Sequence, residues 1–166
     1  MIRLVSVNDA FSIAQILIDA WRCAYIEIVP KSYLDELNIE EKTKRWEKIL
    51  IESKSTTFVK EVEGEIAGWL SYGLSRDDDS HGIGEIWALY VSPKFWRMGI
   101  GSKLMKHIEE VARDSQMSSL SLWVLEKNTH GRSFYEKTGY VRDSFLKNVD
   151  IGGFQLEELR YIKSVE

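Results

Sequence analysis

The sequence predicts a single mixed α/β domain in which helices and strands are arranged around one sheet. Three observations support this prediction. The alternating runs 56–62 and 65–74 are separated by a short turn that contains glycine, which is typical of a β-hairpin. The apolar run 84–91 leads through a glycine loop into residues with helical spacing at 100–111. A strand pattern at 118–125 follows, so we expect a mixed sheet, antiparallel early in the chain and parallel at this central crossover.

The remaining elements follow from the same periodicities. The first third of the chain predicts one strand and three helices, at 2–7, from Asn8 or Asp9 to about Tyr25, at 31–37 and at 38–51. The last third predicts one helix and two strands, at 128–137, 140–145 and 154–162. With 166 residues and no linker, repeat or low-complexity segment, the chain is expected to form one domain over residues 1–166.

Composition excludes several classes of protein. The net charge of −4 argues against a general nucleic-acid-binding protein. No run approaches the ~20 apolar residues of a spanning helix, and Arg3 and Asp9 interrupt the N-terminal segment, so we expect neither a membrane anchor nor a signal peptide. The single cysteine, Cys23, allows no disulfide framework and is expected to be buried on the first helix. A cytoplasmic protein is therefore expected.

Candidate metal ligands do not cluster in the sequence. The three histidines, His81, His107 and His130, belong to three different predicted segments. Three consecutive aspartates lie in the polar loop 75–82, which we interpret as a solvated turn, with attraction of a cationic acceptor as a minor alternative. We expect no metal site.

The glycine loop before the central helix has the features of a phosphate-binding site. The first turn of a helix leaves backbone N–H groups unpaired and positively polarised, and Gly99 and Gly101 allow an anion to approach them closely. Arg97, Lys103 and Lys106 add positive charge nearby. Such glycines alone are also typical of a tight turn that only caps a helix. The chain has neither a P-loop pattern nor a complete dinucleotide-binding fingerprint.

Residues 96–102 (WRMGIGS), with the strand before them, resemble motif A of the GCN5-related N-acetyltransferase (GNAT) family. Trp96 stands where that family has Gln or Arg, and Arg97 follows one place later, so the role of the side chain at 96 stays open. Residues 124–140 resemble motif B, at the appropriate distance. The resemblance implies a mostly antiparallel sheet of about seven strands, splayed between two central strands and flanked by helices.

The resemblance also implies that acetyl-CoA is the co-substrate. Backbone amides of the glycine loop would hold its pyrophosphate, namely those of Arg97, Met98, Gly99, Ile100, Gly101 and Ser102. The backbone of Leu89, Tyr90 and Val91 would bond the pantetheine arm from one side, and Asn128 from the other. Leu89 and Val91 could equally be buried strand residues, and Asn128 a helix cap; both interpretations can hold together.

Transfer to an amine requires deprotonation of that amine, which costs about 4.6 kcal/mol at pH 7 for a lysine-like group of pKa about 10.4. The resemblance implies that Glu85 accepts this proton and that Tyr135 protonates the departing thiolate. The alternatives are a Glu85 paired with a basic group and a Tyr135 that only packs. The first helices would wall the acceptor site, with Trp21, Tyr25 and Tyr33 as candidate contacts.

The resemblance therefore predicts an acetyl-CoA-dependent N-acetyltransferase that transfers the acetyl group directly to a primary amine of a small molecule or peptide. It also suggests a homodimer through the last strands. The first alternative is a catalytically silent CoA-binding regulatory module. The second is an unrelated nucleotide-binding α/β enzyme, against which the missing P-loop and dinucleotide patterns argue.

Overall fold

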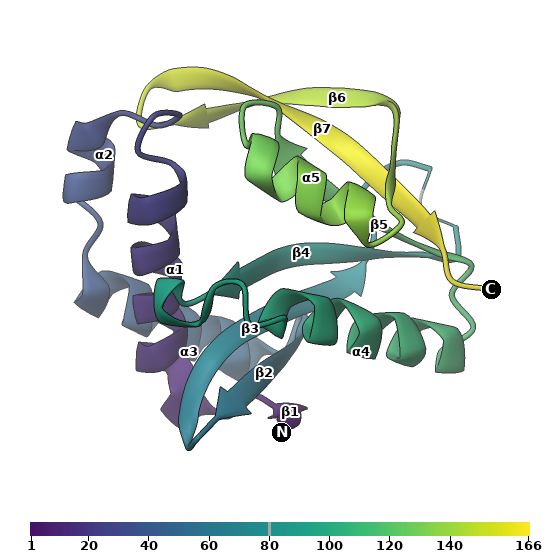
Figure 1. The fold of residues 1–166 in the computed structure, drawn as a ribbon, viewed down its shortest axis with the longest axis horizontal. Helices are drawn as coiled ribbons and strands as arrows, with labels where there is room; N and C mark the ends of the chain where they lie inside the picture. Colours follow the sequence, from purple (N-terminus) through teal and green to yellow (C-terminus); the bar gives the residue numbers. More distant parts are fainter. Residues whose placement is uncertain (80) are drawn as a thin grey trace.

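A computed structural model describes residues 1–79 and 81–166 of the chain, and within them seven strands form one sheet in the order β1-β2-β3-β4-β5-β7-β6 (Figure 1). The strands are β1 (Ile2–Leu4), β2 (Thr56–Val62), β3 (Glu65–Leu74), β4 (Ile83–Val91), β5 (Ser119–Leu125), β6 (Val141–Ile151) and β7 (Phe154–Ser164). The helices are η1 (Val7–Asp9), α1 (Ala10–Ala24), α2 (Lys31–Asp35), α3 (Ile39–Glu52), η2 (Pro93–Phe95), α4 (Ile100–Asp114) and α5 (Thr129–Lys137). These findings confirm the predicted mixed α/β class.

Helices cover both faces of the sheet. Helices α1 and α3 pack on one face, where Trp46 meets Trp69 edge-on with ring centroids 4.7 Å apart. Helices α4 and α5 pack on the other face, where α4 buries Ile108 completely and α5 contributes Phe134 (Figure 1). This division follows from the strand alternation, which sends successive side chains to opposite faces.

The parallel pairing of β4 with β5 is short. It runs from Ile83 opposite Ser119 to Ile86 opposite Leu122, and every other described pair in the sheet is antiparallel. Beyond Ile86 the β5-facing edge of β4 has no strand partner among the described residues. The register between β3 and β4 shifts here, because Tyr72 pairs with Ile86 and Ser71 with Ala88, so that Trp87 is the extra residue of a β-bulge. The sheet therefore opens between its two central strands, as the resemblance implied.

Two predicted element boundaries were wrong by three residues or more. The first strand ends at Leu4 rather than residue 7, because the Ser6 amide donates to the Asp9 carboxylate at 2.7 Å and starts η1. The strand predicted at 140–145 extends to Ile151. Its polar residues hide the alternation, since β6 is an edge strand that pairs only with β7 among the described residues. Gly152 and Gly153, both with positive φ, form the two-residue turn between them.

The predicted burial of Cys23 was also wrong. Cys23 is exposed, as are its neighbours Arg22 and Ala24, because the buried stripe of α1 ends at Ala20. Within the described part of the chain, no helix is long and apolar enough to cross a membrane.

Candidate active site

The glycine loop before α4 presents several unpaired amides. Arg97 (φ 63°) and Gly99 (φ 73°) adopt left-handed backbone conformations, an arrangement that turns successive N–H groups into a concave anion-binding nest. Among the described residues, no group accepts a hydrogen bond from the amides of Gly99, Ile100, Gly101 or Ser102. The Met98 amide differs, because it donates to the Phe95 carbonyl at 3.4 Å. The start of α4 therefore offers four free donors side by side.

Neighbouring groups suit this loop to an anion. The position of a Cβ on Gly99 has no protein atom within 4 Å, so the space beside it is open. A Cβ on Gly101 would lie 3.1 Å from Cζ of Phe134, which brings α5 against the start of α4. The side chains of Arg97, Lys103 and Lys106 are exposed near the same helix end. These features favour a bound diphosphate.

Trp96 has a role that its position in the sequence did not reveal. Its indole N–H donates to the Val91 carbonyl at 2.8 Å. The side chain thus ties the glycine loop to the last residue of β4.

The β4 backbone beside this loop has no strand partner on one side among the described residues. Leu89, Tyr90 and Val91 pair with β3, and their other edge faces the opening toward β5. Asn128 lies at the start of α5, where its side-chain oxygen accepts from the Gly131 amide at 3.0 Å. That bond makes Asn128 a helix cap and leaves its side-chain nitrogen for another partner.

Glu85 is almost fully buried, with an exposed fraction of 1%, and it is ion-paired. Its carboxylate accepts from the Arg76 backbone amide at 2.9 Å and from Arg76 Nε at 3.2 Å, and it also contacts Arg76 Nη2. The Arg76 guanidinium is itself exposed and lies 4.6 Å from the Trp87 ring centroid. The structure therefore shows the basic partner that sequence reasoning considered without naming it.

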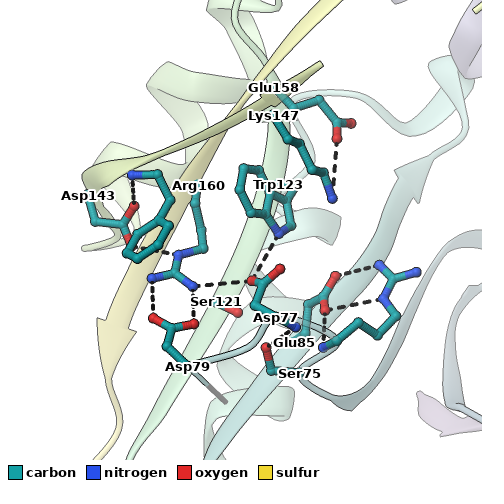
Figure 2. A network of polar contacts seen from close by, with 12 residues as sticks. Ser75, Asp77, Asp79, Glu85, Ser121, Trp123, Asp143, Lys147, Glu158 and Arg160 are labelled. Atoms are coloured by element: carbon teal, nitrogen blue, oxygen red, sulfur yellow. Dashed lines mark hydrogen bonds and ion pairs between the residues drawn. The ribbon is translucent and has the colours of Figure 1, made fainter. Parts of the chain in front are cut away.

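The aspartate loop is not the solvated turn that we predicted. Asp77 and Asp79 form ion pairs with the buried guanidinium of Arg160 on β7, at 3.2 and 2.7 Å (Figure 2). Asp143 on β6 completes this group at 2.7 Å, and these carboxylates raise the pKa of Arg160. Asp77 also accepts from the Trp123 indole at 3.2 Å. Ser80, which belongs to the same loop, lies outside the described residues.

Tyr135 lies on the α4 and α5 side of the opening. Its ring packs edge-on against Phe134 and Tyr140, at centroid distances of 5.3 and 6.3 Å. Its hydroxyl has no hydrogen-bond partner within residues 1–79 and 81–166. Burial, reinforced by the nearby Tyr90, holds the pKa of Tyr135 well above its ordinary value. The phenol therefore stays protonated at neutral pH and keeps a proton to donate.

The structure brings the predicted acceptor residues together. Trp21 lies 4.9 Å from Tyr25 and 6.2 Å from Tyr33 between ring centroids, and its indole donates to the Tyr90 hydroxyl at 2.9 Å. Burial raises the pKa of both Tyr25 and Tyr90. Tyr33 packs toward the β6–β7 turn, where a Cβ on Gly152 would lie 2.8 Å from its ring. An aromatic wall thus faces the opening from the α1 side.

Sequence reasoning missed Arg76, Trp123, Glu158 and Arg160. The available signal was the placement of Glu158 and Arg160 two residues apart in the predicted strand, which puts two charges on one face of β7. Within the described residues no group of three potential ligands could hold a metal ion.

The chain is similar to several known proteins. The model of the acetyltransferase (GNAT) family matches residues 13–140. An uncharacterized N-acetyltransferase, YuaI of Bacillus subtilis (strain 168), is 29% identical over 158 residues, covering 95% of this chain and 89% of that protein. A spermidine N(1)-acetyltransferase of Thermoplasma acidophilum is 25% identical over 142 residues, covering 84% of this chain and 86% of that protein.

The fold is also found among solved structures. The PaiA N-acetyltransferase of Thermoplasma acidophilum, solved in complex with coenzyme A, superimposes with a TM-score of 0.76 at 18% identity, covering 99% of this chain and 98% of that one. Because the family model spans most of the chain, the protein belongs to the acetyltransferase (GNAT) family and is an acetyl-CoA-dependent acyltransferase.

Proposed function

We propose that this enzyme transfers the acetyl group of acetyl-CoA directly to a primary amine of a small molecule or peptide. The observation that carries the proposal is the row of free amides at Gly99 to Ser102 beside the unpaired edge of β4. A diphosphate on those amides and an arm along Leu89, Tyr90, Val91 and Asn128 would aim the thioester into the opening between β4 and β5. Arg97 and Met98 complete the loop that holds the diphosphate.

In the proposed reaction the amine nitrogen attacks the thioester carbonyl, a carbon–nitrogen bond forms and the carbon–sulfur bond breaks. Glu85 takes the proton that the amine loses, directly or through water, and Tyr135 gives a proton to the departing thiolate. The Arg76 contact fixes the direction of the Glu85 carboxylate. No covalent enzyme intermediate and no metal ion is required.

The acceptor would lie against the aromatic wall of Trp21, Tyr25 and Tyr33. The names of two similar proteins support small amines as acceptors. One acts on spermidine, and another, from Bacillus subtilis (strain 168), acts on S-(2-succino)cysteine and is 29% identical over 93 residues, covering 54% of this chain and 56% of that protein.

The test has two parts. A thermal shift with acetyl-CoA, ATP and NAD should show stabilisation by acetyl-CoA, and stabilisation by ATP or NAD alone would contradict the proposal. Release of free thiol with a panel of amines then measures turnover. Glu85→Gln should slow turnover most at low pH, whereas activity equal to the parent across pH would remove Glu85 from the mechanism.

The ion pair between Arg76 and Glu85 favours one alternative, a regulatory module that binds CoA without turnover, because three N–H groups of Arg76 already occupy the carboxylate that an amine would have to reach. Such a module would show the acetyl-CoA thermal shift but release no thiol with any amine.

Two further expectations belong to this proposal. The exposed apolar residues Val141, Phe145, Leu146 and Phe154 of the edge hairpin support a homodimer through β6 and β7. Sedimentation of the parent and of Leu146→Lys would test it, since a dimer should shift toward monomer in the variant. A cytoplasmic location is supported by the single, unpaired cysteine and is testable by cell fractionation.

A further inference from the structure

The polar side chains near the opening differ in how firmly they are held. Asp77, Asp79 and Asp143 each accept a hydrogen bond from Arg160, and Glu85 accepts from Arg76 (Figure 2). The side-chain oxygens of Glu158 accept no hydrogen bond within 3.5 Å from any described residue. The nearest cation is the ammonium of Lys147, whose nitrogen lies 3.6 Å from a Glu158 oxygen. The Glu158 carboxylate is therefore held less firmly than the other carboxylates of this network.

Glu158 is positioned at the opening rather than on the outer surface. It pairs with Leu125 at the end of β5, beyond the last β5 residue that pairs with β4, and its side chain is 21% exposed. Burial raises the pKa of Glu158, and its charge is in turn one of the causes that raise the pKa of Tyr25 and Tyr90. Glu158 therefore lies near the aromatic wall of the candidate acceptor site.

The ammonium group of Lys147 already lies between Glu158 and the ring of Trp123. Lys147 Nζ lies 4.2 Å from the ring centroid of Trp123, so one ammonium contacts both an aromatic face and a carboxylate (Figure 2). This pair of contacts is the arrangement by which proteins bind organic cations. Lys147 holds it loosely, because its contact with Glu158 exceeds hydrogen-bond length and its side chain is 40% exposed on an edge strand.

We propose that Glu158 and the ring of Trp123 form a binding site for a second ammonium group of the acceptor, which displaces Lys147. The acceptor class is then a diamine or polyamine. This inference rests on the proposed function, since the first amine is the one that reacts beside Glu85.

The strand register sets the spacing between Glu85, where the first amine reacts, and the proposed site for the second ammonium group. Glu85 pairs with Ser121, whereas Glu158 pairs with Leu125, four residues farther along β5. At about 3.3 Å per residue, roughly 13 Å of strand separates the levels of the two carboxylates, and Trp123 lies between them, two residues beyond Ser121 on β5. A diamine whose two nitrogens are roughly 7 to 13 Å apart therefore fits this spacing.

The test compares 1,8-diaminooctane with octylamine, which has the same chain but one ammonium group. Calorimetric titration of the CoA-bound protein should show at least a tenfold weaker affinity of Glu158→Gln for the diamine, with octylamine affinity unchanged. Lys147→Met, which keeps an apolar chain over Trp123 without the charge, should bind the diamine more tightly than the parent. Glu157→Gln, an equal charge change at the exposed neighbouring position of β7, is the matched control and should leave both affinities unchanged.

Equal losses for both ligands in Glu158→Gln, or no loss for either, would overturn the inference, as would weaker diamine binding by Lys147→Met. The titration requires no turnover, so it separates this inference from the proposed function. A protein that binds the diamine through Glu158 but acetylates no amine would refute only the reaction.

Discussion

Replacing Gly99 with alanine isolates the contribution of the free amides. Gly99 has φ 73°, and an added Cβ would meet no protein atom within 4 Å. The only cost to the folded protein is therefore the left-handed conformation, about 1–2 kcal/mol for a non-glycine residue. For a domain of this size that cost lowers the melting temperature by roughly 2–8 °C.

The chain supplies a matched control in Gly64, at the β2–β3 turn. Gly64 has φ 83° and also has no atom within 4 Å of an added Cβ, so Gly64→Ala should lose a similar amount of stability. Only Gly99→Ala should lose acetyl-CoA affinity, because relief of the strain turns amides of the loop away from the diphosphate. Loss of one hydrogen bond to a charged group, about 1.5–3 kcal/mol, corresponds to roughly a 10- to 100-fold weaker affinity.

Thermal unfolding without ligand measures the loss of stability, and calorimetric titration with acetyl-CoA measures the loss of affinity. If Gly99→Ala binds acetyl-CoA as tightly as Gly64→Ala does, the amides of this loop do not hold the diphosphate. The assignment of the co-substrate site would then have to move elsewhere on the molecule.

Three further predictions concern the residues around the opening. Tyr135→Phe should lower turnover by roughly 100-fold with acetyl-CoA affinity unchanged, as expected for loss of a general acid. Tyr140→Phe, the control, should not lower turnover. Equal turnover in both variants would exclude the role of Tyr135 as general acid. Arg160→Met leaves three carboxylates without their partner and should cost about 3 kcal/mol of stability in urea unfolding; an unchanged midpoint would show that the ion pairs contribute nothing. The Arg160 contact lowers the pKa of Asp79, so the stability that this ion pair contributes is present above the unfolded pKa of about 3.9 and is lost as pH falls through the lower folded value. The fall in melting temperature between pH 5 and 3 should therefore be smaller in Asp79→Asn than in the parent. An equal fall in the two proteins would refute the assignment.

The sequence predicted the elements whose signals are local. The β2–β3 hairpin has the predicted bounds because alternation and a glycine turn both act within a few residues. Glu85, Tyr135 and the glycine loop could be selected because the resemblance fixes them by short motifs. The structure places them around one opening, and their roles stay predictions.

The partners of these residues could not be predicted, because each pairing joins residues from different elements of the fold. Arg76 and Glu85 are nine residues apart in the chain, but Arg160 lies 81 residues from Asp79. Only the sheet order, with β7 inserted beside β5, brings these charges together. A loop of adjacent aspartates has the same composition whether it is solvated or paired, so its sequence alone could not decide between the two.

The loop after β3 joins the two halves of the sheet through opposite charges at neighbouring positions. Arg76 reaches back to Glu85 on β4, whereas Asp77 and Asp79 reach across β5 to Arg160 on β7. These contacts lie at the level of Ser121 to Trp123, close to where the pairing of β4 with β5 ends. The loop therefore fastens β4 and β7 together at one end, and the strands separate only beyond that point. Because Arg76 also binds the buried carboxylate of Glu85, the contact that stabilises this end of the sheet is the same contact that fixes the proposed proton acceptor.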